Sequence, residues 1–291
     1  MAAVLAPPPV HQSLKQRLRN ANPGDPTGAF NEFFRMQFLG LLGQNPAWVL
    51  KGGTHLLCRL QDARTTKDLD LFHNSTDNAE ASVRKLIAEM NGATIGRYTF
   101  EFGPTVKTNT QGHLDIAQVQ VHVRDGGLRV ADFPIDVSGS VTLNADPTRH
   151  TIRTAAAIPG YPSQISIALY PIENQLADKL CAMYQDYGRG PSTRYHDLYD
   201  AAMIVDQLPF NKSTLQAALN TQYVRRRMRI PADLPEPAPG WAAAYDKVVP
   251  KLAGTQPPFT SYTAAMAIVR TKVAPTLERV ATDNTGRDIQ R

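Results

Sequence analysis

The feature that most constrains this chain is the stretch WVLKGGTHLLCRLQDARTTKDLDLF over residues 48–72. Its apolar start, residues 48–50, predicts a short buried strand that ends at the double glycine Gly52–Gly53. A short helix over about residues 54–61 is expected next, followed by a polar elbow. Glycines at such a turn leave backbone N–H groups exposed at the helix start, where they can hold a phosphate.

A second strand is predicted after the elbow, and it carries Asp68 and Asp70. Side chains alternate along a strand, so an i, i+2 pair points to one face while Leu69 and Leu71 point into a core. Adjacent carboxylates repel each other unless a cation lies between them. Paired carboxylates beside a phosphate-binding turn indicate phosphoryl or nucleotidyl transfer. The alternative is a tight turn with two solvated surface aspartates.

A third carboxylate is needed if two metal ions are held, and Asp136 in the strand-like run FPIDV is the best candidate. Asp132 and Asp115 are weaker candidates. Pro134 marks an edge-type strand, so a solvated aspartate at Asp136 is an equally good interpretation. Around the glycine turn, Lys51 and Thr54 are expected to contact phosphate.

Two later helices carry further candidates. A helix opened by Pro171 places Lys179 off its apolar stripe, so the amine can leave the core, although a lone helical lysine is usually solvated. In the next helix Asp197 and Asp200 share a face at i, i+3, where helix capping competes with a functional role. The run RRRMR over residues 225–229, with Tyr223 beside it, either grips an RNA backbone or forms a solvated helix face.

Length and composition support a globular protein with one large or two modest domains, since 291 residues with 42% hydrophobic content can bury a substantial core. We expect a loose arm over residues 1–27, an α/β domain with a mixed sheet and flanking helices over 28–160, and a mainly helical domain over 161–291. Strands are predicted at about 93–102, 114–123, 128–137 and 165–169. The stretch 144–162 is expected to be irregular.

Net charge and cysteine content indicate which partners and which cellular compartment to expect. The net charge of +5 mildly favours a polyanionic partner. Cys58 and Cys181 show no pairing or metal spacing and are expected to be free thiols in a cytoplasmic protein. No run approaches the roughly 20 apolar residues that span a bilayer, and no signal peptide is expected. The sequence is compatible with a monomer but does not fix the oligomeric state.

Three motifs together resemble a known family. The double glycine followed by RTTKDLDL is similar to the signature of the DNA polymerase β-like nucleotidyltransferase superfamily. The segments ENQLADKL, from Glu173, and RYHDLYD, from Arg194, narrow the resemblance to AbiEii/AbiGii-type toxins, which include the mycobacterial MenT toxins. One departure is His196, which stands where the family usually has lysine. The resemblance spans about residues 30–230.

The resemblance implies an Mg²⁺-dependent (or Mn²⁺-dependent) nucleotidyltransferase toxin that moves a nucleoside monophosphate from an NTP to an acceptor. For several family members the acceptor is tRNA, which blocks translation, and the usual partner is an antitoxin. The implied metal ligands are the acidic pair and Asp136, while the implied catalytic and nucleotide-binding residues are Asp68, Asp70, Lys179, Asp197, Asp200, Lys51, Gly52, Gly53, Thr54, Arg64, Thr66 and Glu173. Two alternatives stay open: nucleotidylation of a protein or small molecule, and a non-catalytic RNA- or partner-binding module.

Overall fold

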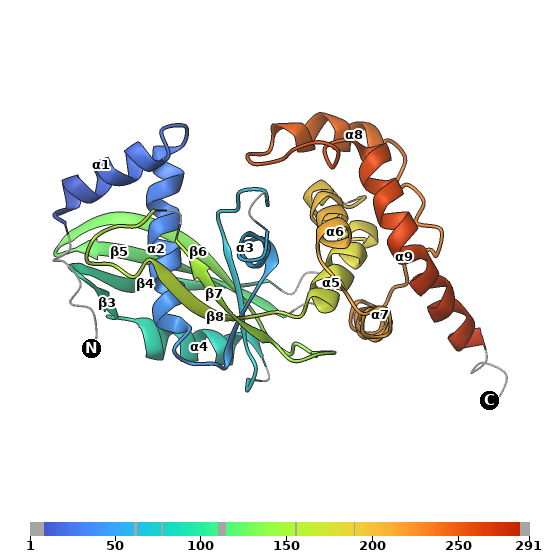
Figure 1. Ribbon diagram of the computed structural model, residues 1–291. Helices are drawn as coiled ribbons and strands as arrows, with labels where there is room; N and C mark the ends of the chain where they lie inside the picture. The colour runs from blue at the N-terminus through green and yellow to red at the C-terminus, as the bar shows by residue number, and fades with distance from the viewer. Residues whose placement is uncertain are drawn as a thin grey trace.

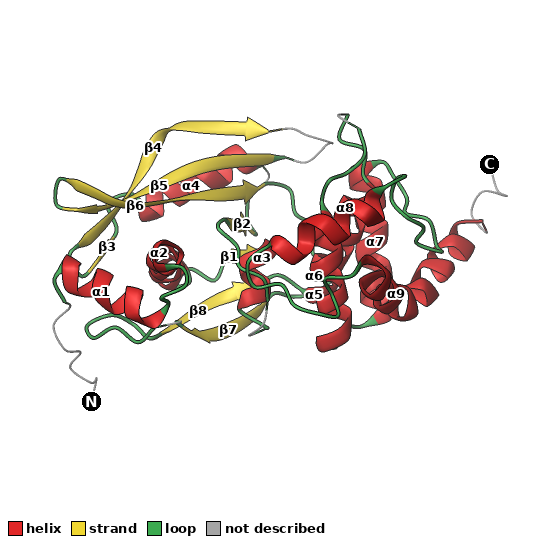
Figure 2. Ribbon diagram, turned by 90° about the horizontal axis from the view of Figure 1, so that it is seen from above, coloured by secondary structure: helices red, strands yellow, loops and turns green. Residues whose placement is uncertain are grey.

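The structure, a computed structural model, describes residues 9–60, 63–76, 78–109, 115–154, 156–188 and 190–285 (Figure 1). Residues 61 and 114, which the sequence assigned to a helix and a strand, lie outside these ranges, as do residues 1–8 of the expected arm. Within them the chain forms a sheet half followed by a helical half (Figure 2). This confirms the predicted α/β class with a mainly helical C-terminal part.

One eight-stranded mixed sheet has the order β3-β4-β5-β6-β2-β1-β8-β7. The pairs β2/β6 and β1/β8 are parallel, and the other neighbours are antiparallel. The strands are β1 (Trp48–Lys51), β2 (Leu69–His73), β3 (Thr94–Ile95), β4 (Tyr98–Asn109), β5 (Ile116–Asp125), β6 (Leu128–Ser138), β7 (Thr148–Arg153) and β8 (Gln164–Leu169).

The strands form because apolar and polar residues alternate along them. In β5 every second residue, from Ala117 through Val119 and Val121 to Val123, is fully buried. These side chains share one core with helices α1 (His11–Ala21), α2 (Pro26–Leu42) and α4 (Ala79–Met90).

The helical half consists of α5 (Ile172–Tyr184), α6 (Tyr195–Gln207), α7 (Lys212–Arg226), α8 (Trp241–Val248), the 3-10 turn η2 (Val249–Lys251) and α9 (Tyr262–Thr285). The short helix α3 (Gly52–Leu57) leaves the sheet at β1 and buries Leu56 and, just beyond it, Leu60 in the core of the helical half. The two halves are therefore joined by shared apolar packing as well as by the chain.

Three expectations about the plan are corrected. Residues 11–21 form a packed helix, because Leu14 and Leu18 at i, i+4 are both buried against α2. Strand β7 lies inside the stretch expected to be irregular. Strand β8 pairs with β1, so the sheet half extends to residue 169 and the predicted boundary at 160 falls too early. Among the described residues, no helix combines the length and apolarity that membrane crossing requires.

Candidate active site

The glycine turn after β1 packs directly against the acidic strand. Gly52 has φ +69°, and a Cβ added to it would lie 1.9 Å from Oδ2 of Asp70, so only glycine fits. Gln175 of α5 clamps this turn: the Gly52 N–H donates to Oε1 (3.0 Å), and Nε2 donates to the Gly52 carbonyl (3.3 Å). The Gly52 N–H is thus already used, and a phosphate at this turn must take other donors.

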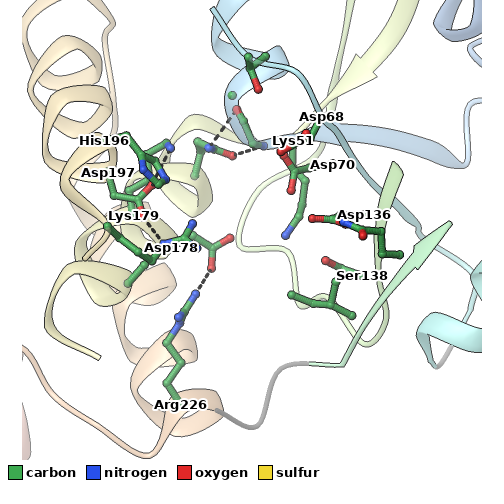
Figure 3. Close-up of a pocket in the computed structure, with 18 of the residues that line it drawn as sticks. Lys51, Asp68, Asp70, Asp136, Ser138, Asp178, Lys179, His196, Asp197 and Arg226 are labelled. Atoms are coloured by element: carbon green, nitrogen blue, oxygen red, sulfur yellow. Dashed lines mark hydrogen bonds and ion pairs between the residues drawn. The ribbon is translucent and has the colours of Figure 1, made fainter. Parts of the chain in front are cut away.

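Three carboxylates meet at one end of the central strands of the sheet (Figure 3). Strand β6 pairs with both β5 and β2, so the edge-type strand that Pro134 indicated is not found. Asp70 on β2 is the register partner of Asp136 on the parallel strand β6, and Asp68 precedes β2 by one residue. Burial and then the charge of Asp70 raise the pKa of both Asp68 and Asp136. Nε2 of Gln118 donates to Oδ1 of Asp136 at 2.8 Å and fixes its orientation. Lys51 lies opposite Asp70 on β1.

The elbow, residues 63–68, leads into β2 and is held by buried polar groups. Arg35 of α2, 6% exposed, donates to the carbonyls of Lys67 (2.9 Å) and Thr66 (3.0 Å). The Thr54 hydroxyl donates to the Asp68 carbonyl at 2.8 Å. These bonds fix the backbone that presents the acidic pair. Thr54 therefore supports the elbow and does not face a phosphate, contrary to expectation.

A buried ion network occupies the facing side of the cavity. Lys179 of α5 donates to Oδ1 of Asp197 (3.1 Å) and Oδ2 of Asp200 (2.6 Å) on α6. Arg64 of the elbow makes a bidentate pair with Asp200, both bonds 2.9 Å long, and Arg194 donates to Asp197 at 2.5 Å. Two carboxylates are thus shared among three cations, and the network ties the elbow to the helical half.

The charges in this network stabilise one another. Burial opposes the charge of Lys179, but the carboxylates of Asp200 and Asp197 outweigh it and raise the lysine pKa. Burial likewise opposes the charge of both carboxylates, and the surrounding cations hold both pKa values below the ordinary range. His196 lies 3.5 Å from Asp197, and burial lowers its pKa, which keeps it neutral at pH 7.

The two sides enclose a cavity of about 570 Å³ between the sheet half and the helical half. The strands contribute Asp70 and Asp136 together with Lys51 and Gln118, and the helices contribute Gln175, Asp178, Lys179 and Asp197 (Figure 3). The Lys51 ammonium, which lines the cavity, forms no hydrogen bond or ion pair with the described part of the chain. It is therefore a cation available to an anionic ligand.

The structure brings most of the predicted site residues to this cavity. Its lining includes Lys51, Gly52, Gly53, Arg64, Thr66, Asp68, Asp70, Asp136, Lys179 and Asp197. Three predicted residues lie elsewhere. Thr54 supports the elbow, Asp200 lies beneath Lys179 and Arg64, and Glu173 accepts a hydrogen bond from the N–H of Asn211 at the start of α7.

Sequence reasoning missed several lining residues, among them Gln118, Gln175, Asp178, Tyr187 and Arg226. Arg226 belongs to the basic run that the sequence did single out, but it is 8% exposed and faces the cavity rather than solvent. Tyr223, proposed beside it as an RNA contact, is instead buried in the core of the helical half. Nothing in the sequence marks Gln118 or Gln175.

The described residues contain no group of three His, Cys, Asp or Glu side chains placed to hold a metal ion by themselves. The carboxylates of Asp68, Asp70 and Asp136 are hard oxygen donors of the kind that Mg²⁺ takes. Magnesium is usually bound through one or two carboxylates together with waters and substrate phosphates. The donor set therefore fits a magnesium ion shared with a triphosphate, but not a closed protein cage.

Comparison with solved structures shows that this fold occurs in other proteins. The structure of MenT4, a nucleotidyltransferase toxin from Mycobacterium tuberculosis, has the same fold, with a TM-score of 0.62, 17% identity and 94% of each chain covered. JHP933 from Helicobacter pylori is less similar, with a TM-score of 0.47, 15% identity, and 90% of this chain and 97% of that chain covered. No curated protein matches the sequence.

The amino-acid sequence shows which family the chain belongs to. The profile described as "Nucleotidyl transferase AbiEii toxin, Type IV TA system" matches residues 37–278. The chain therefore belongs to the AbiEii family of nucleotidyltransferase toxins, a toxin–antitoxin family, which implies an antitoxin partner.

Proposed function

We propose that this toxin transfers a nucleoside monophosphate from an NTP to an acceptor, with tRNA as the acceptor, and thereby blocks translation. One observation carries the proposal: Asp68, Asp70 and Asp136 on the sheet side lie across a single cavity from a helical side that carries Lys179, Arg194 and Arg226. Nucleotidyl transfer needs these opposed surfaces, because divalent ions must be held beside a triphosphate whose negative charge is also neutralised.

Each side has a distinct role in this reaction. The Lys51 ammonium holds the triphosphate together with Lys179, whose charge is secured by two carboxylates, while the Gly52 N–H stays bonded to Gln175. Asp197 and Asp200 keep Lys179 and Arg64 in position. The elbow bonds hold Asp68 and Asp70 side by side before substrate binds, so little reorganisation is required on binding.

The metal requirement rests on the donor set. Asp68 and Asp70 are the proposed magnesium ligands, with Asp136 as the third carboxylate because it is the register partner of Asp70. Magnesium bound there supplies charge neutralisation at the leaving pyrophosphate. Burial and mutual repulsion of these carboxylates make a bound cation favourable between them.

Two features favour an RNA acceptor over the alternatives. The chain carries a net charge of +5, and the exposed Arg227 and Arg229 follow α7 close to the cavity residues Arg225 and Arg226. Cations beside an active site attract a phosphate backbone in a salt-dependent manner.

The decisive experiment incubates the protein with labelled NTPs, magnesium, and tRNA, total RNA or protein extract. Label is expected in tRNA, and Asp70→Asn and Asp136→Asn should reduce it to background while the far-ultraviolet circular dichroism stays unchanged. Asp132→Asn is the matched control, because Asp132 lies on the same strand as Asp136 but outside the cavity, paired with Arg129 and His122. Transfer that survives chelation of divalent ions, or label in protein alone, would contradict the proposal.

A further inference from the structure

A second group of residues lines the cavity on its helical side. Facing the carboxylates lie Asp178 and Ala182 of α5, Tyr187 in the loop that follows, and Arg226 at the end of α7. In Figure 3 the Asp178 carboxylate and Arg226 approach from this side, across from Asp70 and Asp136. The roles assigned above to phosphate, metal and acceptor leave Tyr187 and Arg226 without one.

Each of the three guanidinium nitrogens of Arg226 donates to a protein acceptor, which uses three of its five N–H groups. Nε donates to Oε1 of Gln222 at 2.8 Å, Nη1 donates to Oε1 of Gln185, and Nη2 donates to Oδ1 of Asp178 at 3.3 Å. All three nitrogens are thus engaged, and the guanidinium is fixed with only 8% of the residue exposed. Burial raises the pKa of Tyr187, and the nearby charges of Arg194 and Arg226 oppose that rise.

This arrangement distinguishes Arg226 from an arginine that binds phosphate. A guanidinium holds phosphate through its N–H edge, usually with two parallel hydrogen bonds, and here every nitrogen of that edge already donates to the protein. A guanidinium held in this way can still offer its flat face, which stacks on planar rings. Tyr187 adds an aromatic ring at the same place, and such surfaces are where proteins stack nucleobases.

We propose that Arg226 and Tyr187 form the seat for the base of the incoming NTP. This inference rests on the proposed function, since it assumes that the cavity binds a nucleotide. Ala182 lines the same side, and its short side chain leaves room for a planar ring. The volume of about 570 Å³ is that of a cavity which encloses a whole small molecule rather than a triphosphate alone.

The seat also fixes the direction in which the nucleotide lies. The uncommitted ammonium of Lys51 is on the sheet side, beside the glycine turn and Asp70, so the triphosphate occupies that side. The base then points toward α7. Stacking tolerates every base because each has a π-face, so this seat contributes affinity without selecting one nucleotide.

Isothermal titration of the magnesium-loaded protein with each of the four NTPs, and with inorganic triphosphate, tests the seat. Tyr187→Ala should weaken binding of every NTP by roughly tenfold and change inorganic triphosphate binding less than about twofold. Tyr187→Phe keeps the ring and should bind NTPs like the parent protein. Arg226→Lys, which keeps the charge but removes the plane, should behave like Tyr187→Ala, and Lys51→Met should weaken both ligands. Thermal melts establish that each variant is folded.

The outcomes separate this inference from the proposed function. If the parent protein binds and transfers nucleotide while Tyr187→Ala keeps its NTP affinity, the base seat is wrong and the function stands. Parallel loss of NTP and inorganic triphosphate affinity in Tyr187→Ala also overturns the seat. An unchanged NTP Kd with a raised KM for RNA would assign the ring to the acceptor and likewise overturn it. If the parent binds no nucleotide, both proposals fail.

Discussion

The buried network around Asp200 makes a quantitative prediction about stability. Asp200→Asn keeps the size of the side chain and removes its charge, so Lys179 and Arg64 lose the carboxylate that they share. Asp200 is 1% exposed and accepts three bonds, one from Lys179 (2.6 Å) and two from Arg64 (2.9 Å each). An asparagine amide group would place N–H donors against cationic donors.

The expected loss in the free energy of unfolding is about 3–5 kcal/mol, the usual cost of removing one partner of a buried ion pair. This exceeds the typical effect of a surface substitution, which lies within about 0.5 kcal/mol. Asp206→Asn is the matched control, because Asp206 lies on the same helix and is exposed.

The pH dependence follows from the direction of the pKa shifts. Burial opposes ionisation of Asp200, but Lys179 and Arg64 outweigh it and lower its pKa. A lowered carboxyl pKa gives stability that is complete above the unfolded value of about 3.9 and is lost as the pH falls toward the folded value. The difference between the parent and Asp200→Asn should therefore be roughly 1 kcal/mol smaller at pH 3 than at pH 7.

Urea denaturation followed by circular dichroism at pH 7 and pH 3 measures both quantities. The same variant should also lose transfer activity, because Lys179 is no longer held between two carboxylates. A loss below about 1 kcal/mol at pH 7, or one equal to that of Asp206→Asn, would refute the view that this network is a tightly coupled buried cluster.

Two further substitutions test how the elbow and the turn present the acids. Gly52→Ala should abolish transfer, because its Cβ would meet Asp70. Gly92 also has a positive φ but open space around it, so Gly92→Ala should cost only about 1–2 kcal/mol of stability with activity retained. Arg35→Gln should cost about 2–3 kcal/mol and reduce transfer, because two carbonyls of the elbow lose a buried charged donor. Arg17→Gln at an exposed position should change neither, and equal unfolding midpoints for the two arginine variants would contradict this.

The acidic side of the site could be predicted from the sequence because it follows from strand geometry. A period of two places Asp68 and Asp70 on one face, and the apolar residues flanking Asp136 mark a strand that can pair with theirs. The structure brings all three to one end of the central strands, where they line the cavity. The parallel pairing of β2 with β6, which makes Asp70 and Asp136 direct partners, could not be deduced, because it depends on long-range sheet order.

The helical side was predicted less completely, since spacing on a helix does not reveal its neighbours. Arg226 is the last residue of α7 and turns inward, while Arg227 is the C-cap in the left-handed conformation and faces solvent. Glu173 shows the same limit: its position on the first turn of α5 is correct, yet the nearest N–H is that of Asn211 on α7. The helix at residues 11–21 was missed because only Leu14 and Leu18 mark its buried face.

The contacts that cross between the halves explain why the site depends on both. In the sheet alone, Arg35, Lys51 and Lys67 would be left to offset the repulsion among the carboxylates. The helices alone would present cations around Asp197 and Asp200 without the three carboxylates that they face across the cavity. Arg64 joins the elbow to α6, Gln175 joins α5 to the glycine turn, and α3 buries its leucines in the helical core. Because these contacts lie in the glycine turn itself, in the helix that follows it and in the elbow before the acids, separating the halves would also displace the catalytic groups. The spacing between acid and cation is therefore set by packing before any substrate binds.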